Sequence, residues 1–149
     1  MWQLIQLVNS DIMVNWGIAV RGICENNGKI LLMKVRSKSV HDACKWELPG
    51  GKVKRNEFFD ESLIREFKEE TDLDVEVIDF IKVVENDYVA CKTKEEVKSL
   101  QIIMEVKAET EKIRISNEHD QYDWFTIEEI KDMALNNQLS KAATDVFLE

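Results

Sequence analysis

Three glutamates lie close together in the sequence, at Glu66, Glu69 and Glu70. The segment around them has the apolar spacing of a helix, whose predicted core face consists of Phe59, Leu63, Ile64 and Phe67. At about 100° per residue, the glutamates line one flank of the helix and overlap the edge of that face. Such a flank is either an ordinary solvated acidic surface or a site for hard divalent cations, because Mg²⁺ prefers carboxylate oxygen. Spacing alone leaves both interpretations open.

A tight turn precedes this helix. The chain contains five glycines and one proline, and three of these six residues are consecutive at Pro49, Gly50 and Gly51. Glycine has no Cβ, so the backbone at such a turn can approach a ligand or another element closely. Because breakers are so scarce in this chain, we expect this turn to have a specific role beside the acidic helix.

Length, charge and cysteine content restrict the class of protein. The chain has 149 residues, 44% of them apolar, which suits a single domain over residues 1–149. Its formal net charge of −9 argues against a nucleic-acid backbone or an anionic membrane as the main partner. No run approaches the ~18 apolar residues that a membrane-spanning helix needs, and the first residues lack the pattern of a secretory signal. Three cysteines without a CxxC pair fit reduced thiols, so we expect a cytoplasmic protein.

The rest of the pattern predicts the elements that must position these residues. Residues 17–23 and 29–35 form a predicted hairpin, because the turn sequence Glu25-Asn26-Asn27-Gly28 separates two aliphatic runs. Further strands are predicted over 45–48, 75–84, 100–108 and 122–125, with a solvated connection over 92–99. Helices are predicted over 58–71, 126–136 and 140–147, the second from a capping-box sequence that begins at Thr126. The fold class is therefore α/β (α+β), a mixed β-sheet sandwiched between α-helices.

From Gly51 onward the chain resembles the Nudix box of the Nudix (MutT-like) hydrolases: Gly, five residues, Glu, seven residues, Arg-Glu, apolar, any, Glu-Glu, any, Gly, apolar. The preceding Trp46-Glu47-Leu48-Pro49-Gly50 also resembles the family's usual sequence. The one departure is Asp72, which stands where the family has a glycine at the end of the helix. Aspartate tolerates the left-handed conformation there at a cost of about 1 kcal/mol, so the departure bears on stability rather than on catalysis. The other eight of the nine specified positions match: Gly51, Glu57, Arg65, Glu66, Phe67, Glu69, Glu70 and Leu73.

The resemblance implies a metal site on the helix. Members of the family hydrolyse a nucleoside diphosphate linked to another group, X, by attack of water at a phosphorus. Such chemistry requires charge neutralisation and an activated water, both of which Mg²⁺ or Mn²⁺ supplies. The implied metal ligands are Glu66, Glu69, Glu70 and the carbonyl of Gly50. Among the carboxylates, Glu66 is the expected general base, with Glu69 as a rival.

The resemblance also gives roles to residues around the metal ligands. Arg65 is expected to orient the glutamates through charge-assisted hydrogen bonds, and Glu57 to tie the loop to the helix. Gly51 and Arg36 are expected near the phosphates, and Tyr88 is expected to stack on a base, although large aromatics more often belong to a core. Glu118 resembles the family's additional carboxylate. It is therefore expected as a fifth metal ligand and as a second rival for the general base. The alternatives at this position are an ordinary loop glutamate, Asp120 and Glu85.

The implied activity is that of a Mg²⁺-dependent pyrophosphohydrolase, most directly one that cleaves a (modified) nucleoside triphosphate to a monophosphate and pyrophosphate. ADP-ribose or a dinucleoside polyphosphate is the alternative substrate, and a non-catalytic nucleotide-binding sensor is the alternative function. A hydrolase of RNA ends is disfavoured because the sequence has no basic stripe. We expect a small-molecule nucleotide as partner, no nucleic acid, no membrane, and a monomer or homodimer. The apolar segment 2–16 is either a dimer interface or an edge strand.

Overall fold

The computed structural model describes residues 15–148. Its helices in this range are α2 (Phe59–Thr71), α3 (Ile127–Leu135) and α4 (Lys141–Leu148). Its strands are β1 (Asn15–Asn26), β2 (Lys29–Val35), β3 (Trp46–Glu47), β4 (Gly50–Lys52), β5 (Val75–Glu85), β6 (Tyr88–Val89), β7 (Glu96–Ala108) and β8 (His119–Phe125).

A mixed sheet connects these strands. Its order is β3-β2-β1-β7-β5, with β4 paired to β1, β6 to β7 and β8 to β2. β1 runs parallel to β7, whereas β1 is antiparallel to both β2 and β4. The predicted hairpin is confirmed, but β1 and β2 pair only at its tip, where Glu25 faces Ile30 and Asn26 faces Lys29. Beyond the tip the two strands separate, and there β1 pairs with β4, while its other edge pairs with β7.

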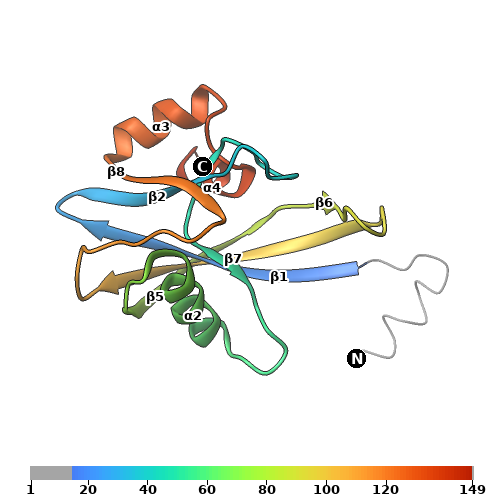
Figure 1. The fold of residues 1–149 in the computed structure, drawn as a ribbon, viewed down its shortest axis with the longest axis horizontal. Coiled ribbons are helices and arrows are strands. Elements are labelled where there is room, and N and C mark those ends of the chain that lie inside the picture. The colour runs from blue at the N-terminus through green and yellow to red at the C-terminus, as the bar shows by residue number, and fades with distance from the viewer. Residues whose placement is uncertain (1–14, 149) are drawn as a thin grey trace.

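Helices cover the sheet on two sides (Figure 1). α2 packs against β1, β4 and β5, over a core that includes Val20 and Phe67. α3 and α4 lie on the other side, over a second core that includes Leu32 and Ile130. The predicted mixed sheet between α-helices is therefore confirmed, and α2 with its acidic flank lies beside the short strand that carries the two glycines.

The predicted core face of α2 is partly wrong. Leu63 and Phe67 are fully buried, but Phe59 and Ile64 are 46% and 40% exposed. The physical reason is the close contact between α2 and β1, because a Cβ added at Gly22 would lie 2.4 Å from the Phe67 ring. With Phe67 seated against β1, the acidic flank turns toward the sheet. The buried side of α2 consequently includes three polar residues: Ser62, Glu70 and Thr71.

Several elements begin earlier than predicted. β7 begins at Glu96, because Glu96 and Val97 pair with β6, so half of the predicted solvated connection over 92–99 is strand. β6 itself was not among the predicted strands. β8 begins at His119, since its pairing with β2 continues as far as Val35. Long-range pairing of this kind extends strands into polar sequence that local patterns assign to loops.

Both helix-end predictions are confirmed. Thr126 caps α3, since its hydroxyl accepts a hydrogen bond from the Glu129 N–H at 3.3 Å and the Glu129 carboxylate accepts one from the Thr126 N–H at 2.8 Å. Asp72 ends α2 in the left-handed conformation, with φ 63° and ψ 11°.

Most of the apolar segment 2–16 lies outside the described residues, so its two interpretations are not tested. No helix between residues 15 and 148 has the length and apolar character needed to cross a membrane.

Candidate functional site

The Gly50–Gly51 backbone lies in contact with both β1 and α2. Gly50 has φ +148°, and a Cβ added there would lie 2.0 Å from the carbonyl oxygen of Val20. A Cβ added at Gly51 would lie 2.5 Å from the carboxyl carbon of Glu66. Neither position has space for a side chain, so the two glycines allow the backbone to approach the carboxylates of α2 directly.

Glu70 is the most buried carboxylate of the acidic flank. Its side chain reaches the turn, where Oε2 accepts a hydrogen bond from the Gly50 N–H at 3.0 Å, and the residue is 4% exposed. Burial raises the pKa of Glu70 well above its usual range. Arg21 and the Gly50 hydrogen bond oppose this rise, whereas the carboxylates of Glu47 and Glu66 add to it. Glu70 therefore retains a proton at a pH where an exposed glutamate has lost its own.

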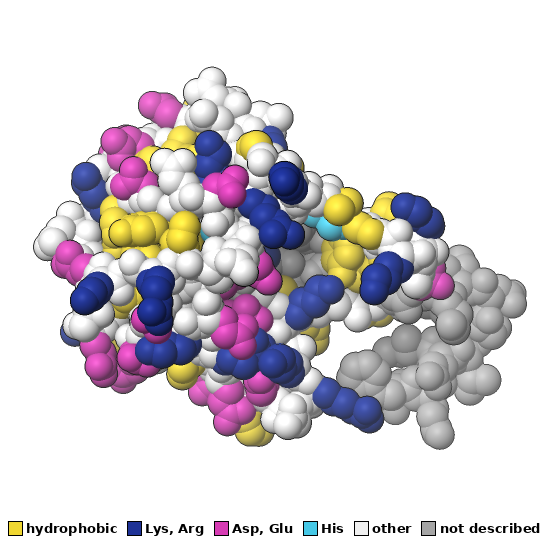
Figure 2. All heavy atoms as spheres, viewed as in Figure 1, with side chains coloured by type: hydrophobic (Ala, Val, Ile, Leu, Met, Phe, Trp, Pro, Cys, Tyr) yellow, Lys and Arg dark blue, Asp and Glu magenta, His cyan; other side chains and the backbone are white. Residues whose placement is uncertain are grey.

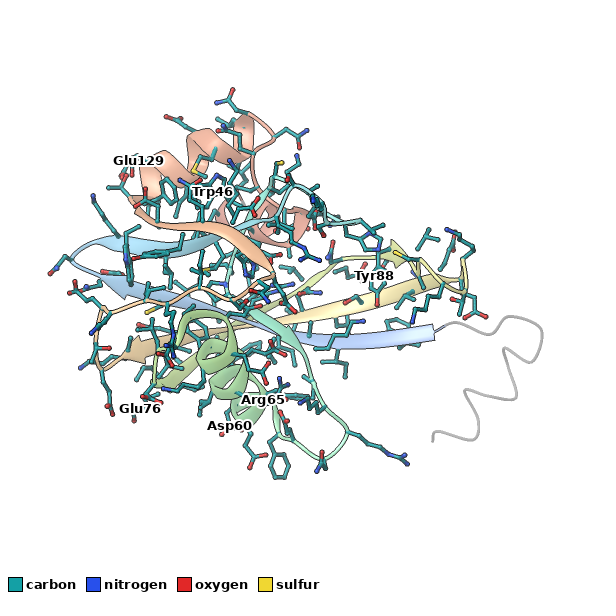
Figure 3. The ribbon with its side chains drawn as sticks, in the orientation of Figure 1. Trp46, Asp60, Arg65, Glu76, Tyr88 and Glu129 are labelled. Atoms are coloured by element: carbon teal, nitrogen blue, oxygen red, sulfur yellow. The ribbon has the colours of Figure 1, made fainter. Side chains whose placement is uncertain are left out.

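Arg65 gathers the other three box carboxylates (Figure 3). Its Nε donates to both oxygens of Glu57, at 2.8 and 3.0 Å. Its Nη1 donates to Glu66 at 2.8 Å and to Glu69 at 3.2 Å, and its Nη2 donates to the carbonyl of Lys52 at 3.1 Å. Burial alone would lower the pKa of Arg65, but these carboxylates raise it. The planar guanidinium thus fixes three acidic side chains and the loop after β4 in one arrangement.

Glu57 joins that loop to α2. Besides the Arg65 guanidinium, its carboxylate accepts a hydrogen bond from the Ser62 hydroxyl at 2.7 Å. The hydrogen bond from Ser62 lowers the pKa of Glu57 the most, and the hydrogen bonds from Arg65 lower it further. Glu57 thus contacts both Ser62 and Arg65 of α2, and Arg65 contacts Glu66 and Glu69, while the catalytic roles expected of these residues stay predictions.

The donor set near the turn has the chemistry of a hard-cation site. Glu66, Glu69 and Glu70 offer carboxylate oxygens and Gly50 offers a carbonyl oxygen, which are the ligand types that Mg²⁺ and Mn²⁺ take. Among residues 15–148, no three acidic, histidine or cysteine side chains converge on one point in this conformation. The buried Glu70 nevertheless fits a cation, because burial raises its pKa, the carboxylates of Glu47 and Glu66 add to that rise, and a bound cation would favour the charged carboxylate.

A cavity of about 1080 Å³ begins at the turn and extends between β1, β7 and the segments around β3 and β8. Gly51, Arg36, Tyr88 and Glu118, all predicted site residues, line it. Glu57, Glu66, Glu69 and Glu70 do not, so the cavity and the carboxylates of α2 meet at Gly51. The volume is enough for a nucleotide-sized molecule.

The predicted substrate-binding residues lie at different places along this cavity. Arg36 donates through Nη1 to the carbonyl of Asn117 at 3.3 Å, which places its guanidinium beside the β8 end of the cavity. Tyr88 lies farther along on β6 (Figure 3), with its ring 5.6 Å from that of His41 and 5.9 Å from the Lys52 ammonium. Lys and Arg side chains are interspersed with acidic ones on the face shown in Figure 2, and several lie near a histidine. Basic side chains are thus present on this face despite the net negative charge of the chain.

Glu118 has a better position than its two rivals. It lines the cavity, whereas Asp120 and Glu85 do not. The Asp120 carboxylate accepts a hydrogen bond from the Ser37 N–H at 3.0 Å, so it holds a loop in place. Glu85 lies at the end of β5, where its backbone carbonyl accepts from Lys141 at 3.1 Å.

Sequence reasoning did not find a buried polar network that lines the same cavity. Arg21 donates to the carbonyls of Leu48 at 3.0 Å and Gly50 at 3.4 Å, and pairs with Glu47 at 3.5 Å. Glu47 also lies 2.9 Å from His119 Nε2. Burial alone would raise the pKa of Glu47, but Arg21 and His119 lower it. The signal in the sequence was Arg21 itself, a charged residue inside the aliphatic run that became β1.

His119 is the end of this network. Because the Glu47 carboxylate accepts only, His119 Nε2 carries a proton in that hydrogen bond. His119 Nδ1 is the one buried side-chain nitrogen or oxygen in residues 15–148 that has no partner. Since the residue lines the cavity and is 5% exposed, its ring forms part of a polar wall rather than of the apolar core.

Comparison with known proteins agrees with the resemblance to the Nudix family that the sequence shows. A family model described as "NUDIX domain" matches residues 14–145. The crystal structure of the MutT protein from Methanosarcina mazei Go1 aligns with a TM-score of 0.77 and 28% identity, over 92% of this chain and 94% of that one.

Two curated relatives match shorter parts. The chain is 34% identical over 71 residues, 48% of its length, to an 8-oxo-dGTP diphosphatase of Proteus vulgaris, of which the match covers 62%. It is 46% identical over 56 residues, 38% of its length, to an ADP-ribose pyrophosphatase of Methanocaldococcus jannaschii, of which the match covers 32%. The matches thus span less than two thirds of these relatives.

Proposed function

This chain belongs to the NUDIX domain family, and we propose that it is a divalent-metal-dependent hydrolase of a nucleoside diphosphate linked to a further group. The most direct substrate is a nucleoside triphosphate, normal or modified, cleaved to a monophosphate and pyrophosphate. The observation that carries this proposal is the arrangement around Gly51. There the carboxylates that Arg65 gathers and the buried Glu70 meet a cavity large enough for a nucleotide.

In this proposal the metal ligands are Glu66, Glu69, Glu70 and the carbonyl of Gly50, with Glu118, which lines the cavity, as a fifth. A bound Mg²⁺ or Mn²⁺ would neutralise phosphate charge and lower the pKa of a coordinated water. Arg65 holds Glu66 and Glu69 in position by its two hydrogen bonds from Nη1. Because Gly51 has no side chain, its backbone lies directly against the Glu66 carboxyl, which brings this carboxylate to the edge of the cavity.

The proton of the attacking water requires an acceptor near the phosphorus. We assign this role to Glu66, which lies between the Arg65 guanidinium and the Gly51 backbone. Its side chain is 14% exposed, compared with 54% for Glu69, so Glu66 is the better shielded of the two from bulk water. Arg36 is assigned to the phosphates, and Tyr88 to the far end of the substrate.

ADP-ribose is the second candidate substrate. One observation favours it, since the cavity extends from Gly51 to Tyr88 and provides room for a group beyond a single nucleoside. A non-catalytic sensor is a poorer fit, because every carboxylate of the box is present, three of them held by Arg65 and Glu70 by the Gly50 N–H. The relatives named above, an 8-oxo-dGTP diphosphatase and an ADP-ribose pyrophosphatase, agree with both catalytic candidates.

Product analysis on a nucleotide panel tests the proposal. Nucleoside triphosphates, ADP-ribose and a dinucleoside polyphosphate are incubated with Mg²⁺ in ¹⁸O-water, and the labelled product identifies the attacked phosphorus. We expect Glu66→Gln and Glu69→Gln to lower turnover by about 100-fold or more. Glu76→Gln, at an exposed position on β5, is the matched control and should leave turnover unchanged. Turnover that survives excess EDTA contradicts the proposal, and nucleotide binding without any turnover by the unchanged protein supports the sensor instead.

A further inference from the structure

The floor of the cavity is formed by polar residues in the centre of the sheet. Gln101 and Ser99 on β7 are each 4% exposed and line the cavity beside Arg21 of β1. Central strands ordinarily present apolar side chains on both faces, so two buried polar side chains at alternate positions of one strand need partners. Their hydrogen bonds determine what the floor offers to a bound molecule.

The direction of each hydrogen bond here is fixed by chemistry. Arg21 Nε lies 3.1 Å from Gln101 Oε1, and a guanidinium only donates, so the Gln101 amide must present its oxygen to Arg21. Its nitrogen then faces Ser99, and Nε2 donates to the Ser99 hydroxyl oxygen at 2.9 Å. One hydrogen of the Gln101 amide and the hydroxyl hydrogen of Ser99 have no acceptor among residues 15–148. Both are donors available at the cavity floor.

Arg21 cannot turn away to reverse this arrangement. Its Nη1 donates to the carbonyls of Leu48 and Gly50, and it pairs with the Glu47 carboxylate at 3.5 Å. Glu47 is in turn held by His119 at 2.9 Å. A rotation of the Gln101 amide by 180° would place its N–H₂ group against the Arg21 N–H and leave both unsatisfied, which costs about 1–3 kcal/mol per buried group.

We propose that Gln101 determines substrate specificity, because its free amide N–H, fixed in direction by Arg21 and flanked by the Ser99 hydroxyl, selects a ring bearing a carbonyl oxygen over the same ring bearing an amino group. This rests on the proposed function, in which the cavity beyond Gly51 receives the nucleoside part of the substrate. A carbonyl oxygen on the floor accepts from these donors. An exocyclic amino group in the same place directs N–H toward N–H and leaves both sides desolvated without a bond.

Two pairs of nucleotides exchange these two groups, and in each pair the adjacent ring nitrogen also changes, from an N–H beside the carbonyl to an acceptor beside the amino group. Inosine and adenosine triphosphates differ at ring position 6, where a carbonyl replaces an amino group, and uridine and cytidine triphosphates differ in the same way at position 4. We expect kcat/KM to favour the carbonyl-bearing member of each pair by about tenfold or more, the value of one well-placed hydrogen bond. Gln101→Glu keeps the acceptor for Arg21 Nε but replaces the free N–H with an acceptor. In this variant we expect the preference to fall at least tenfold, with thermal unfolding measured to show that the protein folds.

Gln121→Glu is the matched control, since this glutamine is exposed on β8 and does not line the cavity. It should retain the preference of the unchanged protein. Gln101→Met, which removes the amide donor at similar volume and leaves Ser99 in place, should also lose the preference. Agreement between the two Gln101 variants excludes an effect of the added charge.

Titration calorimetry with inosine and adenosine monophosphates separates failure of this inference from failure of the proposed function. Nucleotide turnover whose carbonyl preference is the same in folded Gln101→Glu overturns the inference and leaves the hydrolase intact. Tighter binding of inosine monophosphate, lost in Gln101→Glu, in a protein that cleaves no nucleotide supports the inference and contradicts the hydrolase. Equal binding and equal turnover of both members of each pair overturn the inference.

Discussion

The burial of Glu70 gives the metal-free protein a pH dependence of stability that one substitution removes. Because burial raises the pKa of Glu70 well above its ordinary value, the folded state retains a proton that the unfolded state loses. Below the unfolded pKa both states are protonated and the contribution to stability is complete. As the pH rises toward the folded-state pKa, the unfolded state binds fewer protons and stability falls.

The magnitude follows from one proton. Stability changes by at most about 1.4 kcal/mol per pH unit for each proton taken up on folding. For a chain of this size 1 kcal/mol corresponds to roughly 2–4 °C in Tm, so the contribution of Glu70 is about 3–6 °C per pH unit. Glu70→Gln removes the charge but retains an oxygen that accepts from the Gly50 N–H. This variant should therefore gain stability relative to the unchanged protein as the pH rises.

Thermal unfolding in EDTA, followed by circular dichroism from about pH 4 to pH 8, measures this difference. Glu76→Gln removes a charge at an exposed position and is the control for net charge alone, so its curve should run parallel to that of the unchanged protein. The reasoning is refuted if the curve for Glu70→Gln also runs parallel, or if Glu70→Gln is the less stable protein at the alkaline end. Either result would show that burial of the Glu70 carboxylate does not raise its pKa in the folded protein.

Three further substitutions test the geometry of the box. Gly51→Ala should reduce kcat about 100-fold or more, because its Cβ would lie 2.5 Å from the Glu66 carboxyl carbon; full turnover in steady-state assays would contradict this contact. Arg65→Lys should lower kcat about tenfold, because an ammonium cannot reproduce the fork that joins Glu57, Glu66 and Glu69; unchanged kinetics would show that the fork has no role in positioning. Asp72→Gly should raise the free energy of unfolding by about 0.5 kcal/mol, since relief of a left-handed residue outweighs two exposed ion pairs, with Lys68 and Arg114. Denaturant titration measures this gain, which should increase with salt as the ion pairs are screened, and a loss of stability would mean that the pairs dominate.

Local sequence patterns predicted the elements and the box well, for reasons that lie within short segments. The turn at Gly50 and Gly51 and the left-handed end of α2 at Asp72 depend on backbone preferences of neighbouring residues. The contact of Arg65 with Glu69 joins residues four apart on the same helix, so helical spacing alone places these two side chains together. Once the helix forms, side chains at this spacing lie on the same flank of it.

Only the tertiary structure decided which side of that helix is buried and what surrounds it. The sequence cannot say that Phe67 meets β1 at Gly22, which exposes Phe59 and buries Glu70. Nor can it place Arg21 against Gln101, because these residues are 80 positions apart and meet only through the parallel pairing of β1 with β7. The sequence by itself determined where the acidic residues and the glycines are concentrated. The pairing of distant strands determined which polar groups face the cavity, because side-chain partners across a sheet depend on register, and register is a property of the assembled sheet.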